Sequence, residues 1–156
     1  MTEQTDKLVP LTQGAIERKA KKIHEVDGFY IDVKLTEGQL DDLAKIKSLI
    51  KIGGDLSPYY RKSHDRAADA LLLQHNVMHL HLGGSGSDAL LYLVQFPDHV
   101  LFLCVDTHVH VDDIPPGKKL NFFKVQEHIN SMRAAFDENK AVVSASIRSM
   151  MSKRRK

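Results

Sequence analysis

Residues 77–111 have the sequence VMHLHLGGSGSDALLYLVQFPDHVLFLCVDTHVHV, and this stretch decides the fold class. Three mainly apolar runs are separated by two short turn-like segments, Gly83–Asp88 and Pro97-Asp98. Glycine and proline supply the backbone conformations that tight turns need, so both segments predict turns. Sequential strands joined by short turns form an antiparallel meander. We therefore expect three strands, over Val77–Leu82, Leu90–Phe96 and His99–Val111.

Before the meander, the spacing of apolar residues changes from every second position to every third or fourth. Alternation over Phe29–Leu35 predicts a half-buried strand. Thr36 and Gln39 form a capping-box pattern, which predicts that a helix begins there, and Gly53-Gly54 predicts its end. Further upstream, Thr12–Glu25 is rich in good helix formers and predicts an N-terminal helix.

After the meander, Pro115-Pro116-Gly117 ends the sheet and an amphipathic helix follows. Apolar residues recur at spacings of three and four across residues 119–138. The apolar stripe resumes beyond Asn139, which indicates a second helix before the basic end of the chain. The second and third meander strands are apolar on both faces, so we expect helices or the rest of the core to cover both sides of the sheet.

These elements define an α+β fold. We expect an antiparallel sheet, made of the N-terminal strand and the three-strand meander, packed with helices and followed by an extra C-terminal helix. The 156 residues fit one domain of ordinary size with two extensions. The expected parts are an N-terminal helical extension, the α+β domain and a basic helical tail, at residues 1–26, 27–138 and 139–156.

The overall composition indicates a cytoplasmic protein with no membrane segment. The chain is 42% hydrophobic, and its apolar runs are too short to span a bilayer. Its first residues are polar and lack the apolar stretch of a signal peptide. Cys104 is the single cysteine, which excludes an internal disulfide; we expect a buried, inert thiol there.

The net charge of +2 is distributed unevenly along the chain. Residues 114–156 contain ten Lys or Arg and three Asp or Glu, so this segment carries about +7 and the rest about −5. A basic segment suits an acidic partner or a phosphate backbone, and a solvated helix with a frayed tail is the alternative. Five basic residues near the meander are candidates for RNA binding: Arg61, Lys62, Arg66, Lys118 and Lys119.

Four of the nine histidines form two His-x-His pairs. His79 and His81 share one face of a predicted strand, and His108 and His110 share a face in the same way. Carboxylates lie beside the second pair, at Asp106, Asp112 and Asp113. Three uses are open for these histidines: proton transfer near neutral pH, metal binding with the carboxylates, or a structural role with backbone partners.

The meander resembles that of the RelE/ParE toxin superfamily, and within it the YafO-type toxins. The likeness is carried by the segments VMHLHLGG from Val77, ALLYLV from Ala89 and HVLFLCVDTHVHVD from His99. YafO-type toxins similarly have a His-x-His-Leu sequence in the first meander strand. The likeness covers residues 28–113 loosely and 77–113 best.

This resemblance implies a RelE-like fold and the toxin of a bacterial type II toxin–antitoxin pair. Such a toxin is a metal-independent endoribonuclease without a cofactor, which cleaves mRNA, often on the ribosome, and binds an antitoxin protein. The ribose 2′-OH attacks the adjacent phosphate with help from a base, an acid and cations. By position we expect His81 as the base and His108 as the acid, with Arg61 and Arg66 neutralising the phosphate. Three further catalytic candidates lie beside them: His79, His110 and Asp112.

Two other functions remain open. The first is a non-catalytic member of the same fold, which binds a protein or a nucleic acid through its C-terminal helices. The second is a metal-binding protein that uses the two His-x-His pairs.

Overall fold

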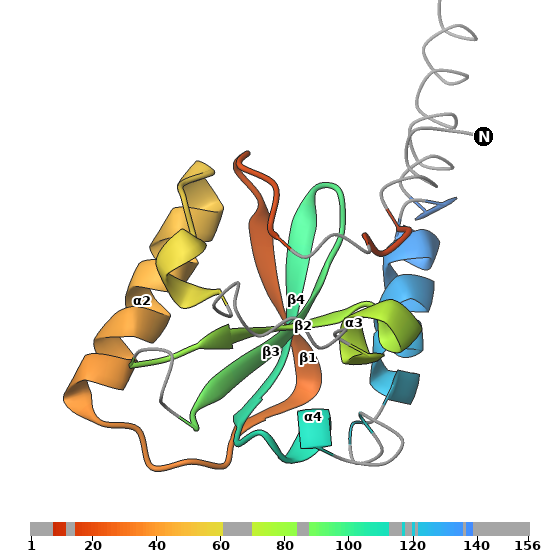
Figure 1. Ribbon diagram of the computed structural model, residues 1–156. Helices are drawn as coiled ribbons and strands as arrows, with labels where there is room; N and C mark the ends of the chain where they lie inside the picture. Colours follow the sequence, from red (N-terminus) through yellow and green to blue (C-terminus); the bar gives the residue numbers. More distant parts are fainter. Residues whose placement is uncertain are drawn as a thin grey trace, which may run out of the picture.

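A computed structural model describes residues 8–11, 15–60, 70–83, 88–112, 117, 120, 122–135 and 137–138 of the protein. Its centre is a sheet of four strands, β1 (Lys22–Ile31), β2 (Val77–His81), β3 (Leu90–Gln95) and β4 (His99–Asp106). The strand order is β1-β4-β3-β2. Helices pack against this sheet, so the predicted α+β class is confirmed (Figure 1).

The predicted meander is confirmed. β2 pairs antiparallel with β3, and β3 pairs antiparallel with β4, so that Val77 lies opposite Val94 and Leu90 lies opposite Asp106. The third strand is shorter than predicted, because β4 ends at Asp106 and a helical turn, α4 (Val109–Asp112), follows it.

β1 differs from the prediction in both position and direction. It begins at Lys22, seven residues before the predicted start, and it pairs with β4 in parallel. The sheet is therefore mixed, and the predicted all-antiparallel sheet is wrong. The pairing register shifts between Glu25 and Tyr30, where Gly28 takes a φ of 87° that favours glycine.

The helix predicted over Thr12–Glu25 is wrong in its described part. Residues 15–21 are irregular, and Lys22–Glu25 belong to β1, where they pair with residues 99–102 of β4. Helix propensity is a weak preference of well under 1 kcal/mol per residue, and the backbone hydrogen bonds offered by the exposed edge of β4 outweigh it.

The helix α2 (Glu37–Ile52) begins and ends where the sequence predicts. The Thr36 hydroxyl accepts a hydrogen bond from the backbone of Gln39, whose side chain accepts one from the backbone of Thr36. Gly53 ends the helix with a φ of 75°, and a Cβ there would lie 2.6 Å from the backbone of Lys19. Glycine is thus needed at this end of the helix for its conformation and for the close approach of another segment.

Helices cover both faces of the sheet, as predicted (Figure 1). One core lies between the sheet and α2, which contributes Leu43, Ile46 and Ile50. The other lies under the helix of residues 122–135, which contributes Ile129 and confirms the described part of the predicted helix over 119–138. Two short elements complete the described fold, η1 (Ser57–Tyr59) and α3 (Ala70–His75). The predicted tail at residues 139–156 lies outside the described residues.

Within the described ranges, no helix of the protein has the length and apolar character needed to cross a membrane.

Candidate functional site

The first His-x-His pair lies on the buried face of β2. His79 is opposite Tyr92 and His81 is opposite Leu90 on β3, so all four side chains share the face of the sheet under the helix of residues 122–135. His79 and His81 are only 8% and 6% exposed, and their ring centroids are 5.5 Å apart. The predicted common face of this pair is confirmed.

His108 lies in the turn between β4 and α4, next to the end of β2. Its ring centroid is 5.9 Å from that of His81. Asp88, just before β3, accepts hydrogen bonds through Oδ1 from the backbone N–H of His108, at 2.9 Å, and from its Nδ1. The His108 side chain is 35% exposed, so this imidazole meets solvent while one of its nitrogens is held by a carboxylate.

Asp88 and His108 form a dyad with the geometry of a general acid or base. The hydrogen bond from the His108 imidazole lowers the pKa of Asp88, so the carboxylate is ionised at neutral pH. Because Asp88 holds Nδ1, the other nitrogen, Nε2, is the atom that can exchange a proton with a substrate. His81 supplies a second imidazole beside that of His108, so two imidazole rings lie next to each other where β2 ends.

Sequence reasoning assigned Asp88 only to a turn and missed its place in this dyad. The signal was present in the hairpin pairing of the second and third strands. Since Leu90 lies opposite Asp106, the residues just beyond these two, Asp88 and His108, leave the sheet at the same edge. The signal is partial, because the turn at Pro97-Asp98 alone sets a register that places Thr107 opposite Asp88. The irregularity between Tyr92 and Leu93 shifts the pairing by one residue and brings His108 to Asp88.

His110 does not join His108, because the strand ends before both residues. The prediction that the second His-x-His pair shares a strand face is therefore wrong. His110 belongs to α4, where its Nε2 lies 3.0 Å from Asp106 Oδ2 and 3.2 Å from the hydroxyl of Tyr30. Its ring also contacts Tyr92 edge-on, at a centroid distance of 4.9 Å.

The remaining predicted site residues are less completely placed. Asp112 is the last residue of α4. The five predicted RNA-binding residues all lie outside the described residues, at Arg61, Lys62, Arg66, Lys118 and Lys119. Their contact with a phosphate backbone stays a prediction.

A separate cluster of three histidines was not predicted. His99 Nε2 lies 2.9 Å from His128 Nε2, and the ring of His24 packs against both, with centroid distances of 5.1 and 5.6 Å. Asp98 accepts a hydrogen bond from His99 Nδ1 at 2.7 Å. Burial lowers the pKa of His128 to about 4 and also lowers that of His99, so both imidazoles are neutral at pH 7. The three residues come from β1, β4 and the helix of residues 122–135, and the sequence carries no local sign of their contact.

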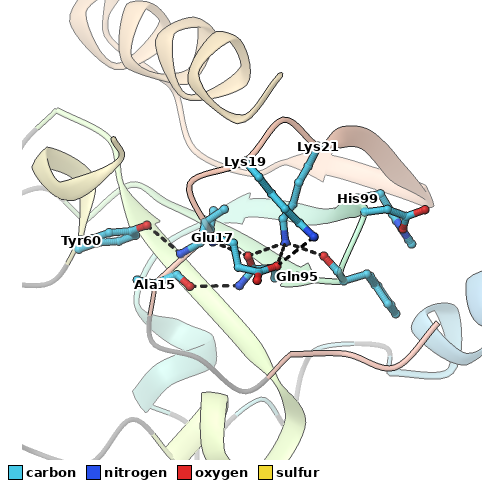
Figure 2. Close-up of polar contacts among 10 residues, drawn as sticks. Ala15, Glu17, Lys19, Lys21, Tyr60, Gln95 and His99 are labelled. Atoms are coloured by element: carbon cyan, nitrogen blue, oxygen red, sulfur yellow. Dashed lines mark hydrogen bonds and ion pairs between the residues drawn. The ribbon is translucent and has the colours of Figure 1, made fainter. Parts of the chain in front are cut away.

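Lys21 is a buried cation at the far end of the sheet (Figure 2). Its Nζ donates hydrogen bonds of 2.8 Å to Glu17 Oε1, Gln95 Oε1 and the carbonyl of Phe96. Gln95 Oε1 also accepts from the backbone of Glu17, and Gln95 Nε2 donates to the carbonyl of Ala15. Burial lowers the pKa of Lys21, and these oxygen atoms replace its lost hydration. The network attaches residues 15–21 to the sheet and is structural.

Comparisons with protein-family models, with curated proteins and with solved structures found no match to this chain. The geometry of the site and the pattern of the sequence therefore carry the functional argument.

Proposed function

We propose that the protein is a metal-independent endoribonuclease and the toxin of a type II toxin–antitoxin pair, similar to the YafO-type members of the RelE/ParE superfamily. The observation that carries this proposal is the partly exposed imidazole of His108, held by Asp88 and adjacent to His81. Cleavage of RNA by general acid–base catalysis uses a base that removes the proton of the ribose hydroxyl and an acid that protonates the leaving oxygen. Two adjacent imidazoles can serve as this base and this acid.

In the proposed reaction, the ribose 2′-OH attacks the adjacent phosphorus atom. His81 removes the proton of that hydroxyl, and His108 gives a proton to the 5′-oxygen as its bond to phosphorus breaks. The products are a 2′,3′-cyclic phosphate and a free 5′-hydroxyl, so every atom and charge is accounted for without a metal ion. Both ring nitrogens of His81 are buried, so the part given to His81 requires this end of the sheet to open when RNA binds. The His108 side chain is already 35% exposed, and the proposal depends chiefly on His108.

Two other predicted catalytic residues, His79 and His110, have a positioning role in the proposed reaction. His79 packs against His81 on the buried face of β2, and His110 is enclosed by Asp106, Tyr30 and Tyr92. Neither imidazole is directed to solvent in the way that His108 is. We assign no role to Asp112 in the reaction.

Phosphate binding is assigned to the cations that the sequence places around the meander. Arg61, Lys62 and Arg66 precede β2, and Lys118 and Lys119 follow α4, so both groups adjoin the site in sequence. Cations of this kind neutralise the phosphate during the attack. In this account the substrate is mRNA on the ribosome, the protein partner is an antitoxin, and the reaction takes place in the cytoplasm.

The proposal is tested by expression in a bacterial host and by incubation of the purified protein with mRNA and ribosomes in a chelator. We expect growth arrest and RNA cleavage, and we expect His108→Ala to relieve the arrest and lower the cleavage rate by roughly 100-fold or more. His24→Ala, in the separate histidine cluster, is the matched control and keeps both activities. Equal toxicity of folded His108→Ala contradicts the proposed site, and RNA binding without cleavage by the wild type favours the non-catalytic alternative.

A further inference from the structure

Four metal-binding side chains converge behind His108, where β1, β4 and α4 meet. The Cys104 sulfur, an Asp106 carboxylate oxygen and a His110 ring nitrogen all lie within 4.8 Å of one another. Among the described residues, no other group of three or more His, Cys, Asp or Glu has ligand atoms this close. The hydroxyl of Tyr30 lies 3.0 Å from Asp106 Oδ2 and 3.2 Å from His110 Nε2, so it adds a fourth donor to the group.

The cluster is deeply buried. Cys104, His110 and Asp106 are 0%, 1% and 7% exposed. Such groups are stable inside a protein only when their hydrogen-bonding capacity is met. Hydrogen bonds among Asp106, His110 and Tyr30 meet part of that capacity, and His110 faces the other two residues through Nε2.

The donor types and their spacing fit a tetrahedral transition-metal ion. Thiolate, imidazole, carboxylate and phenolate form a mixed sulfur, nitrogen and oxygen set, which suits zinc and excludes the all-oxygen sites of magnesium and calcium. With metal–ligand bonds of about 2.0–2.3 Å, donors at the corners of a tetrahedron lie about 3.3–3.7 Å apart. The three oxygen and nitrogen contacts of 3.0–3.2 Å need to open by only a few tenths of an ångström.

We propose that Cys104, Asp106 and His110, with the hydroxyl of Tyr30 as the fourth donor, bind a zinc ion. Binding replaces the thiol proton of Cys104 by a sulfur–zinc bond and the phenol proton of Tyr30 by an oxygen–zinc bond, and both protons are released to solvent. A pocket between β1 and the helix of residues 122–135 borders the cluster, because Tyr30 and Cys104 are part of its lining together with Gly28 and Lys124.

A cysteine nucleophile is the competing explanation of the same residues, since Cys, His and Asp also form catalytic triads. A nucleophilic cysteine needs access to a substrate, and Cys104 is completely buried. Metal binding is the chemistry that turns such a buried thiol into a thiolate.

The site has a structural role. It connects β1, the end of β4 and α4, and His110 is only two residues from His108. The ion would thereby fix the turn that carries the Asp88–His108 dyad without contacting RNA. This inference is separate from the proposed ribonuclease activity, because neither requires the other.

Cobalt titration of the full chain tests the site directly. The protein is first purified in chelator, and the chelator is then removed. We expect near-ultraviolet thiolate-to-cobalt absorption and the visible bands of tetrahedral cobalt, both saturating at one ion per chain and both lost when zinc is added. Cys104→Ser removes the thiolate band, and Tyr30→Phe, which keeps the ring, weakens cobalt binding at least tenfold. His128→Asn, in the separate histidine cluster, is the control and leaves the spectrum unchanged.

Three results overturn the proposal. They are a wild-type titration without a thiolate band, a Cys104→Ser spectrum that keeps it, and loss of binding in His128→Asn alone. If Cys104→Ser does not fold, the wild-type band still reports thiolate ligation, and Tyr30→Phe decides the fourth donor. RNA cleavage measured on the same samples is a separate readout, since its presence or absence does not alter the cobalt spectrum.

Discussion

At the scale of single residues, differences in burial among four histidines decide which of them can meet a substrate. His79, His81 and His110 are almost completely buried, whereas the side chain of His108 is about one-third exposed. Exposure makes His108 able to meet a substrate, and the Asp88 carboxylate fixes which of its nitrogens does so. Spacing in the sequence makes the four histidines look equivalent, but their surroundings make them different.

Replacement of Asp88 by Asn tests the dyad without removing an imidazole. Asp88→Asn can no longer fix the orientation and tautomer of His108 as a carboxylate does, so we expect RNA cleavage to fall about 10- to 100-fold. The folded state is retained, because Asp88 is exposed on the surface. Asp41→Asn, an equally exposed change on α2, is the control and leaves the cleavage rate unchanged. An Asp88→Asn protein as active as the wild type shows that the carboxylate does not serve His108.

At the scale of helices and strands, local signals predicted α2 and the meander well and predicted β1 poorly. The capping box of Thr36 and Gln39 and the terminal Gly53 are signals within a few residues of the helix ends. The structure contains both of them. β1 is an edge strand whose residues are mostly half-buried or exposed, so its apolar pattern is weak. Its position follows from pairing with β4, more than 70 residues away, and no local signal encodes that contact.

The candidate site likewise has features that local sequence patterns predicted and features that they did not. The common face of His79 and His81 follows from strand periodicity and was predictable. The separation of His108 from His110 was not, because it depends on where β4 ends and α4 begins. The partners Asp88, Tyr30 and Cys104 are brought in by the strand register and by the parallel pairing of β1.

Lys21 attaches the segment before β1 to the sheet, and its replacement tests that attachment. Lys21→Met keeps much of the side-chain volume but removes the Nζ donor to the Phe96 carbonyl and to Gln95 Oε1, which then retains only the backbone N–H of Glu17. We expect the free energy of unfolding to fall by about 2–4 kcal/mol in urea denaturation. Lys19→Met is the control, since the side chain of Lys19 is 53% exposed, and it changes stability by less than about 0.5 kcal/mol. A stable Lys21→Met protein means that the network does not hold this segment.

At the scale of the whole molecule, the histidine cluster links two adjacent strands, the edge strand β1 and the inner strand β4, to the helical layer. His24 comes from β1, His99 from β4 and His128 from the helix of residues 122–135 (Figure 1). All three rings contact each other, and Asp98, Lys21 and Phe96 border them. The packing of this layer therefore depends on imidazoles that stay neutral.

This arrangement predicts a loss of stability at mildly acidic pH. Burial, followed by the charge of His99, lowers the pKa of His128 to about 4, and burial lowers that of His99. The unfolded chain, with histidine pKa values near 6.5, therefore binds more protons than the folded chain between about pH 6.5 and 4. The stabilisation is complete above this window and is lost as the pH falls through it. After discount for the partial exposure of His128, we expect a loss on the order of 1–2 kcal/mol.

Urea denaturation at several pH values measures this effect. The slope of stability against pH between 6.5 and 4 should be smaller in His128→Gln than in the wild type, because the variant lacks one titrating group. Identical slopes in the two proteins contradict the assignment.

The central claim is that a ribose 2′-OH is the nucleophile and that imidazoles move the protons. The most direct measurement uses an mRNA oligonucleotide cleaved by the purified protein in chelator, and the same oligonucleotide with a single 2′-deoxy substitution just before the cleaved bond. The account predicts 2′,3′-cyclic phosphate and 5′-hydroxyl ends from the first and no cleavage at that bond in the second. Cleavage of the substituted bond, or products with 5′-phosphate ends, contradicts it.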